Sequence, residues 1–299
     1  SLNISDSDLN IILKSLISPI VFVRAAILEV LDQEFDLSKL DFNEELWISC
    51  FDNIETNKEV AEAIWSESEF SLKESCVEKL VPYLGAKDNG IRLSIAKSIA
   101  SAIIQLKSDR LFSSSLTGLI DLYRVMSKPP ELETDEFGLV VKSNANQKDR
   151  WEQRSGVALT VTYLAPMFTK SEEVSKFFTF LIKERSLGDK EGLVRSELQE
   201  AGLKIIERNG KGNVEILITI FEECLAEKDE KSKVQDMVKE SVIIMYGSLA
   251  RHLDKDDSRI DAIVNRLLES LDTPSEDVQY AVCLLYTSPS PRDYAASGI

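Results

Sequence analysis

The stretch Gly90-Ile91-Arg92-Leu93-Ser94 places an aliphatic residue and then an arginine near the start of an amphipathic segment, and this arrangement recurs along the chain. The related positions, at which valine precedes arginine or another polar residue, are Val23-Arg24, Val60-Ala61-Glu62, Val194-Arg195, Val238-Lys239 and Val278-Gln279. With Ile91 placed between Val60 and Val194, successive positions lie about 37, 31, 103, 44 and 40 residues apart. The long interval divides into about 62 and 41 residues if Gln153-Arg154 is included. This period, with two helices per unit, is typical of HEAT solenoids. The sequence therefore predicts an all-α fold, a HEAT-type solenoid of antiparallel helix pairs, which usually functions as a binding surface.

Apolar residues around these positions follow the 3.6-residue period of α-helices. Between Ile260 and Leu271 they occupy i, i+3, i+4, i+7, i+8 and i+11, with Asp261 and Arg266 opposite. The same spacing marks the first helices of other units, at Leu9-Ile12-Leu13-Leu16, Val174-Phe177-Phe178-Leu181 and Val214-Leu217-Ile218-Phe221. The second helix of the first unit is expected to bury Val23, Ala26, Ile27, Val30 and Leu31.

The predicted solenoid covers residues 1–282, with one long loop at 127–150. The loop contains Pro129-Pro130, then an acidic run and then the polar run from Asn144 to Lys148. A connection above about 15 residues in a compact array is usually functional or disordered, so this loop is either a surface insertion within the fourth repeat or a binding segment. Residues 283–299 break the helical pattern in mid-repeat and resemble translated read-through of a sequencing adapter, so we predict that they are non-native and exclude them from the fold.

The composition is acidic, which limits the classes of partner. The chain has 299 residues, with 35 Lys and Arg against 51 Asp and Glu, and a formal net charge of -16. Binding to a nucleic-acid backbone needs clustered cations, so a basic protein or peptide is the better partner class, although a local basic strip could still contact RNA. No stretch reaches the roughly 20 apolar residues of a membrane-spanning helix, and the start at Ser1 has no charged-then-apolar leader, which predicts no membrane segment, no signal peptide and a fragment edge.

Residues with the chemistry for catalysis or metal binding are sparse. The cysteines Cys50, Cys76, Cys224 and Cys283 have neither the spacing nor the companion histidines of a zinc site, and they favour a reducing compartment. The single histidine, His252, is expected to be a solvated residue at a helix end and not a catalytic base.

Two further motifs contain residue types that occur in catalytic or phosphate-binding sites. Asn209-Gly210-Lys211-Gly212 lacks the Ser or Thr that follows the lysine of a phosphate-binding loop, and it predicts a turn between helices. The pair Glu222-Glu223 is expected on a solvated helix face. We therefore predict no catalytic residue, no cofactor, no metal site and no enzyme activity.

The tryptophans and the recurring arginines are expected to be structural. The tryptophans, spaced too irregularly for a stacking platform, should lie in the core or between repeats; they are Trp47, Trp65 and Trp151. The arginines should pair with carboxylates in the turns, such as Asp88 or Asp189, and so orient neighbouring repeats; they are Arg24, Arg92 and Arg195.

Several blocks of the chain resemble a known family. They are Met126-Ser127-Lys128-Pro129-Pro130, then Trp151-Glu152-Gln153-Arg154-Ser155-Gly156-Val157-Ala158-Leu159, then Asn213 to Glu223, and then Val238 to Asp256 followed by Leu271-Asp272-Thr273-Pro274-Ser275. Together they are similar to the middle of the large HEAT-repeat translational activator of the general amino-acid control pathway, the general control non-derepressible scaffold. The resemblance extends from about Lys128 to Val282 and is only repeat-level before that.

This resemblance implies a fragment of a very long cytoplasmic solenoid that associates with ribosomes and an ABC-type ATPase. It also implies a role in passing the uncharged-tRNA signal to a protein kinase that phosphorylates an initiation factor. The fragment would lie before, or run into, the part similar to a fungal elongation-factor HEAT domain, and the kinase-binding segment would lie further on. The alternative is another acidic HEAT scaffold, such as an importin-like receptor or a phosphatase scaffold subunit, and the residues Gly247 to Asp256 count against it.

Overall fold

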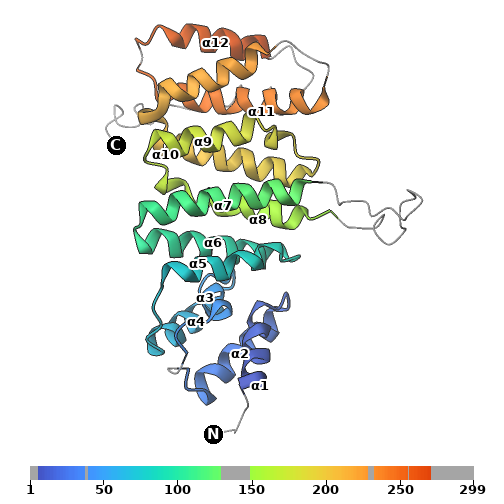
Figure 1. Ribbon diagram of the computed structural model, residues 1–299, viewed down its shortest axis with the longest axis vertical. Coiled ribbons are helices and arrows are strands. Elements are labelled where there is room, and N and C mark those ends of the chain that lie inside the picture. Colours follow the sequence, from blue (N-terminus) through green and yellow to red (C-terminus); the bar gives the residue numbers. More distant parts are fainter. Residues whose placement is uncertain (1–5, 38–39, 129–148, 228–231, 255, 271–299) are drawn as a thin grey trace, which may run out of the picture. The chain divides into compact units, whose positions relative to one another are not determined.

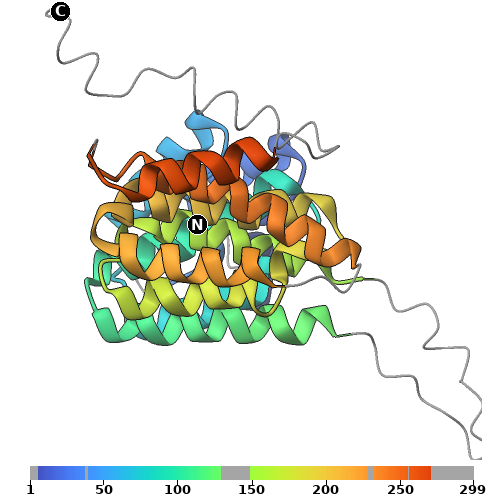
Figure 2. The ribbon, with the colours of Figure 1, turned by 90° about the horizontal axis from the view of Figure 1, so that it is seen from above.

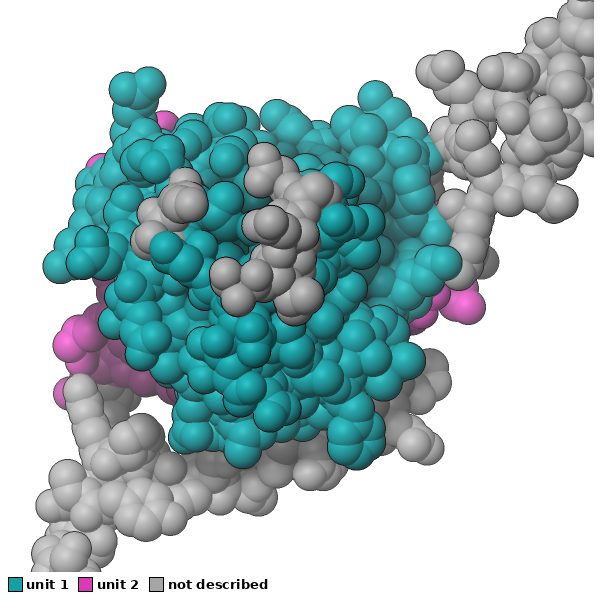
Figure 3. Space-filling view, turned by 90° about the horizontal axis from the view of Figure 1, so that it is seen from below, with its two compact units in different colours: residues 1–163 teal, residues 164–299 magenta. Residues whose placement is uncertain are grey.

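A computed structural model describes residues 6–37, 40–128, 149–227, 232–254 and 256–270. Every regular element within these ranges is a helix, and consecutive helices pack as hairpins (Figure 1). The all-α prediction is therefore confirmed. The chain divides into two compact units, residues 1–163 and residues 164–299 (Figure 3), and each is described by itself. The last repeat position, Val278-Gln279, and the segment 283–299 lie outside the described residues.

The first unit consists of helices and short 3-10 turns in the following order: α1 (Asp6–Lys14), η1 (Ser15–Ile17), α2 (Val21–Glu34), α3 (Glu44–Ser49), α4 (Glu55–Glu67), α5 (Glu74–Leu80), η2 (Val81–Gly85), α6 (Asn89–Leu106), α7 (Asp109–Ser127) and α8 (Trp151–Leu164). Side-chain caps begin three of these helices, because Asn43, Asp88 and Ser108 each accept a hydrogen bond from the main-chain N–H three residues later. Lys107, in the left-handed conformation with φ 50°, ends α6.

The second unit contains η3 (Ala165–Met167), α9 (Ser171–Ile182), η4 (Ser186–Gly188), α10 (Gly192–Ala226), α11 (Lys233–Ala250) and α12 (Arg259–Ser270). Helices α10, α11 and α12 pack in sequence (Figure 2). The predicted turn at residues 209–212 is wrong, because those residues are helical. The chain changes direction instead at Asn213, whose backbone leaves the helical region at φ -125° and ψ 15°.

Polar side chains hold this kink. Ser171 Oγ donates to Asn213 Oδ1 at 2.8 Å, and Asn213 Nδ2 donates to the carbonyl oxygen of Asn209 at 2.9 Å. Asn209 Nδ2 in turn donates to the carbonyl oxygen of Ala165 at 2.8 Å. One non-helical residue, fixed by a neighbouring helix, therefore replaces the expected loop.

The apolar periodicity of α9 was predicted correctly. Val174, Phe177, Phe178 and Leu181 are all buried. Phe178 extends the core to the next helix, where its ring lies 5.7 Å from that of Phe221. A tilted aromatic pair of this kind adds to the free energy gained by burial alone.

The buried face of α2 differs from the predicted one. Leu31 is buried as expected, but Ala26 is exposed and Val30 is 41% exposed. The face that enters the core is centred on Arg24 and continues through Leu28. The apolar pattern did not include Arg24 in the buried face, whereas its guanidinium is buried beside a carboxylate partner.

Candidate interaction surface

The recurring arginines lie where one hairpin meets the next, and Arg24 is the clearest case. Its Nε donates to Asp52 Oδ2 at 2.6 Å and its Nη2 donates to Asp52 Oδ1 at 2.9 Å. Both side chains are nearly inaccessible, at 4% and 3% exposure. Asp52 belongs to the turn between α3 and α4, so this ion pair links the first hairpin to the second. An arginine–carboxylate pair was predicted, but Asp52 was not, because the sequence does not show which turn Arg24 reaches.

The environment of Asp52 favours its ionised form. Burial alone would raise the pKa of this carboxyl, but hydrogen bonds from Arg24, the Ile54 N–H and Asn57, together with the charge of Arg24, lower the pKa below the usual 3.8. The pair is therefore ionised at neutral pH, with its polar atoms satisfied by neighbouring groups.

Arg92 is also buried, but its partners are not those predicted. Its Nε donates to Ser155 Oγ at 2.9 Å and its Nη1 donates to the carbonyl oxygen of Ala86 at 2.8 Å. The guanidinium lies 5.0 Å from the centre of the Trp151 ring, within the range of a cation–π contact. Asp88, the expected partner, accepts instead from the Ile91 N–H and caps α6.

The other two arginines of the pattern bind close to their own turns. Arg154, at the position inserted into the long interval, donates to both carboxylate oxygens of Asp149 at 2.8 and 3.1 Å. Arg195 donates to Asp189, as predicted, but to the main-chain carbonyl oxygen at 2.6 Å. The residues at this position thus connect helices and turns.

The tryptophans are structural, as predicted. Trp47 and Trp65 lie together with ring centres 4.8 Å apart, although 18 residues separate them, and Trp47 Nε1 donates to the carbonyl oxygen of Ser98 at 3.0 Å. The Trp151 ring lies beside the Arg92 guanidinium, between α6 and α8. The sequence spacing did not show that two of the three would be in contact.

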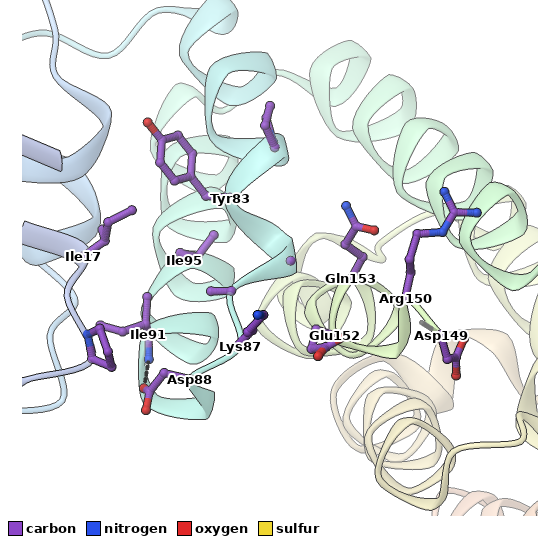
Figure 4. A pocket seen from close by; sticks show the side chains of 14 residues that line it. Ile17, Tyr83, Lys87, Asp88, Ile91, Ile95, Asp149, Arg150, Glu152 and Gln153 are labelled. Carbon is purple, nitrogen blue, oxygen red and sulfur yellow. Dashed lines mark hydrogen bonds between the residues drawn. The ribbon is translucent and has the colours of Figure 1, made fainter. Parts of the chain in front are cut away.

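A pocket of about 940 Å³ opens where inter-helix turns of the first unit meet (Figure 4). Apolar residues from η1, η2 and α6 line one part of it, among them Ile17, Pro82 and Ile95. Charged residues from the turn before α6 and the start of α8 line the remainder: Lys87, Asp88, Asp149, Arg150 and Glu152. Sequence analysis did not identify this pocket, because its lining comes from turns far apart in the chain.

Two of the carboxylates that line the pocket are already engaged in the fold. Asp88 caps α6 and both oxygens of Asp149 are held by Arg154, so these carboxylates already stabilise the fold. Its lining contains no serine, cysteine or histidine that could act as a nucleophile or a base. An apolar floor beside a few charged groups is a common composition for a ligand-binding pocket.

His252 does not match the prediction of a solvated residue. It is half-buried after the end of α11, and a methyl group added at Gly210 would lie 2.8 Å from its Cδ2 atom. Burial lowers the pKa of His252, and the charge of Arg251 lowers it further. The imidazole is therefore neutral at pH 7 and packs against α10.

The acidic pair in α10 joins helices. Glu222 accepts a hydrogen bond from the Tyr246 hydroxyl at 2.8 Å and from Arg266 Nη2 at 3.2 Å. Glu223 forms an exposed ion pair with Lys183 at 2.9 Å. Glu222 is thus more than a solvated surface residue, since it connects α10 to α11 and α12.

The described cysteines have the environment of structural residues. Cys50, Cys76 and Cys224 are buried. Burial raises the pKa of the Cys50 thiol to about 12 and that of Cys224 to about 11, so both stay protonated at neutral pH. Within the described ranges, no three or more His, Cys, Asp or Glu side chains gather in a way that could hold a metal ion. No helix of the described part is long and apolar enough to cross a membrane.

Comparison with known proteins gives a consistent result. The family model described as "Stalled ribosome sensor GCN1, HEAT repeats" matches residues 33–251. The chain is 40% identical over 282 residues to the eIF-2-alpha kinase activator GCN1 of Saccharomyces cerevisiae, with 93% of this chain and 10% of the yeast protein aligned. It is 28% identical to the human stalled ribosome sensor GCN1, with 98% of this chain and 11% of the human protein aligned.

A plant relative supports the same assignment. Protein ILITYHIA of Arabidopsis thaliana is 31% identical over 239 residues, which cover 79% of this chain and 8% of the plant protein. No solved structure matches the chain. The chain thus spans about a tenth of the length of these relatives. Because the family model covers most of both helical units, the chain belongs to the family of GCN1 HEAT repeats.

Proposed function

We propose that this chain is a non-catalytic, cytoplasmic part of a GCN1-type scaffold. In this proposal it provides protein surface through which the longer protein associates with ribosomes and activates the eIF-2-alpha kinase. The family match over residues 33–251 carries the proposal, and the yeast and human relatives are named for these two activities. An association with an ABC-type ATPase is part of the same proposal and rests on the sequence resemblance.

The physical properties of the chain support a role in binding proteins. Within the first unit, the buried side chains of Arg24 and Arg92 connect neighbouring helices and turns, so the outer residues of this unit are held in fixed positions. The net charge of -16 disfavours general contact with RNA phosphates and favours basic protein surfaces. An importin-like receptor or phosphatase scaffold would share these properties, but the family match supports the GCN1 assignment over both.

Replacing residues 33–251 within the complete protein tests this proposal. The replacement would be the same number of hairpins from a phosphatase scaffold, because this keeps a helical array and removes the surface of this chain. In starved cells we expect phosphorylation of the initiation factor to fall about tenfold or more, because the exchanged hairpins lack the surface that the proposal assigns to this chain. Immunoblotting against the phosphorylated factor measures the change. Full phosphorylation with normal amounts of the exchanged protein would refute the proposal.

Residues 127–150, which the sequence predicts to form a long loop, supply a second prediction; residues 129–148 lie outside the described part of the chain. If this loop is the binding segment, exchanging residues 131–147 for a Gly-Ser linker should reduce co-sedimentation of the complete protein with ribosomes several-fold, because a flexible linker has no specific contacts. The effect should be larger at low salt, since the loop contains Glu131, Glu133, Asp135 and Glu136. Helical content by circular dichroism should be unchanged. Unaltered sedimentation at every salt concentration would show that the loop is only a surface insertion.

A further inference from the structure

A groove of about 320 Å³ lies between α5 and α7 in the first unit, and Ile99 of α6 forms part of its floor. Its other apolar residues are Val77 and Val81 on one side and Leu111 and Leu119 on the other. The polar residues that line it are Glu78, Ser114 and Ser115, and Gly118 also faces it. None of these residues belongs to the pocket at the inter-helix turns.

The groove is open because α7 carries small residues on the side that faces α5, which is a short helix. Helix α5 spans only Glu74–Leu80, and α7 presents Ser114, Ser115 and Gly118 toward the space beside it. A methyl group built on Gly118 would have no heavy atom within 4 Å. Neighbouring helices in a solenoid normally fill this space with side chains, because interiors are close-packed. The groove can therefore accept a side chain from outside without any movement of the two helices.

The charge at the groove is negative. Glu78 is the single charged residue that lines it, and this exposed carboxylate has no hydrogen bond or ion pair with any residue in the described part of the chain. The neighbouring cation Lys79 is directed elsewhere, since its Nζ lies 3.5 Å from Glu44 Oε1 and 5.9 Å from the centre of the Phe42 ring. Glu74, one turn before Glu78 on α5, adds to the negative potential.

We propose that this groove binds an amphipathic helix of a partner protein that carries lysine or arginine beside a leucine or isoleucine. The aliphatic side chain enters between α5 and α7, and the cation pairs with Glu78. The small residues of α7 leave space for the apolar side chains of such a helix, and an amphipathic helix is commonly recognised by laying its apolar face into an apolar groove. The net charge of -16 attracts a basic partner over a longer distance. This inference concerns a separate surface and does not depend on the proposed role at ribosomes.

A synthetic helical peptide tests the groove directly. The probe is a fluorescein-labelled peptide of about 18 residues, long enough for a marginally stable helix, with leucines at i, i+4 and i+7 and flanking lysines. The matched peptide has glutamate at every lysine position. Fluorescence anisotropy with the full chain should show tighter binding of the lysine peptide by about tenfold or more, which equals about 1.4 kcal/mol.

Two glycine variants separate the groove from the rest of the surface. Gly118→Leu fills the groove with its own side chain and should weaken binding of the lysine peptide about tenfold or more. Gly212→Leu is the control, because Gly212 also has no heavy atom within 4 Å of a built methyl group but lies in α10. This control should change the affinity by less than about twofold. Neither variant should lower the melting temperature, since leucine favours a helix more than glycine does.

Charge reversal at an exposed position gives an independent measurement. Glu78→Lys should weaken binding of the lysine peptide and strengthen binding of the glutamate peptide. If Gly118→Leu melts at a lower temperature than the parent protein, Glu78→Lys is the variant that tests the proposal. The proposal is wrong if the lysine peptide does not bind, if both peptides bind equally, or if well-folded Gly118→Leu and Glu78→Lys proteins bind like the parent protein.

Discussion

Replacing Asp52 with alanine should destabilise the first unit by about 3–5 kcal/mol, the cost of leaving a buried charge without its partner. Arg24 would remain 3% exposed, with its Nε and Nη2 groups no longer bound to a carboxylate. The Ile54 N–H and Asn57 Nδ2 would also lose their acceptor. Urea unfolding followed by circular dichroism measures the change in the free energy of unfolding.

Two control variants define the origin of this effect. Asp121→Ala removes an exposed ion pair with Arg124, where both side chains are about half exposed, and should cost less than about 1 kcal/mol. The double variant Arg24→Met with Asp52→Leu removes both buried charges and should recover most of the lost stability. If Asp52→Ala unfolds at the same urea concentration as the parent protein, the ion pair does not stabilise the joint between the hairpins.

The same ion pair gives a pH dependence whose sign follows from the lowered pKa of Asp52. A carboxylate whose pKa is lower in the folded state stabilises the fold above its unfolded pKa, about 3.9 for aspartate. That contribution is lost as the pH falls through the lower, folded-state pKa. The stability difference between the parent protein and Asp52→Ala should therefore be constant near neutral pH and shrink below about pH 4.

The sequence predicted features that depend on neighbouring residues in the chain better than features that depend on contacts between distant residues. The apolar spacing of α9 reports local helix geometry and was correct, and the recurrence of helix pairs led to the correct HEAT-type, all-α fold. The buried face of α2 was wrong because periodicity treats arginine as a surface residue. A buried arginine is stable only when a carboxylate reaches it, and Asp52 is 28 residues away in the chain.

The interaction surfaces were less predictable than the helices. The pocket at the turns and the groove beside Gly118 each combine residues from three or more elements, and their shapes depend on how the hairpins stack. Gly118 looks ordinary in sequence, since glycine within a helix is only a mild destabiliser. The block Trp151 to Gly156 carries part of the family resemblance, and in the structure it packs against Arg92 and Leu84.

Gly156 is the residue of this block at which the smallest change should have a large effect. A methyl group at Gly156 would lie 2.6 Å from the carbonyl oxygen of Leu84 and 3.0 Å from Leu84 Cβ, so α8 and η2 would have to separate. Leu84 has little freedom to move, because it is fully buried and because Arg92 holds the following turn through the carbonyl oxygen of Ala86. Gly156→Ala should destabilise the first unit by about 1–3 kcal/mol, the usual cost of overpacking, and the main-chain contact places it toward the upper end.

Two other glycines provide matched comparisons for Gly156→Ala in urea unfolding. Gly118→Ala meets no atom and should stabilise the protein by up to about 1 kcal/mol, because alanine favours a helix more than glycine does. Gly202→Ala would place its methyl group 2.6 Å from Met245 Sδ, and a flexible thioether can move aside, so its cost should be smaller than that of Gly156→Ala. The expected order of stability is therefore Gly118→Ala, then Gly202→Ala, then Gly156→Ala. If Gly156→Ala is as stable as Gly118→Ala, close main-chain contact between α8 and η2 is not what holds this joint together.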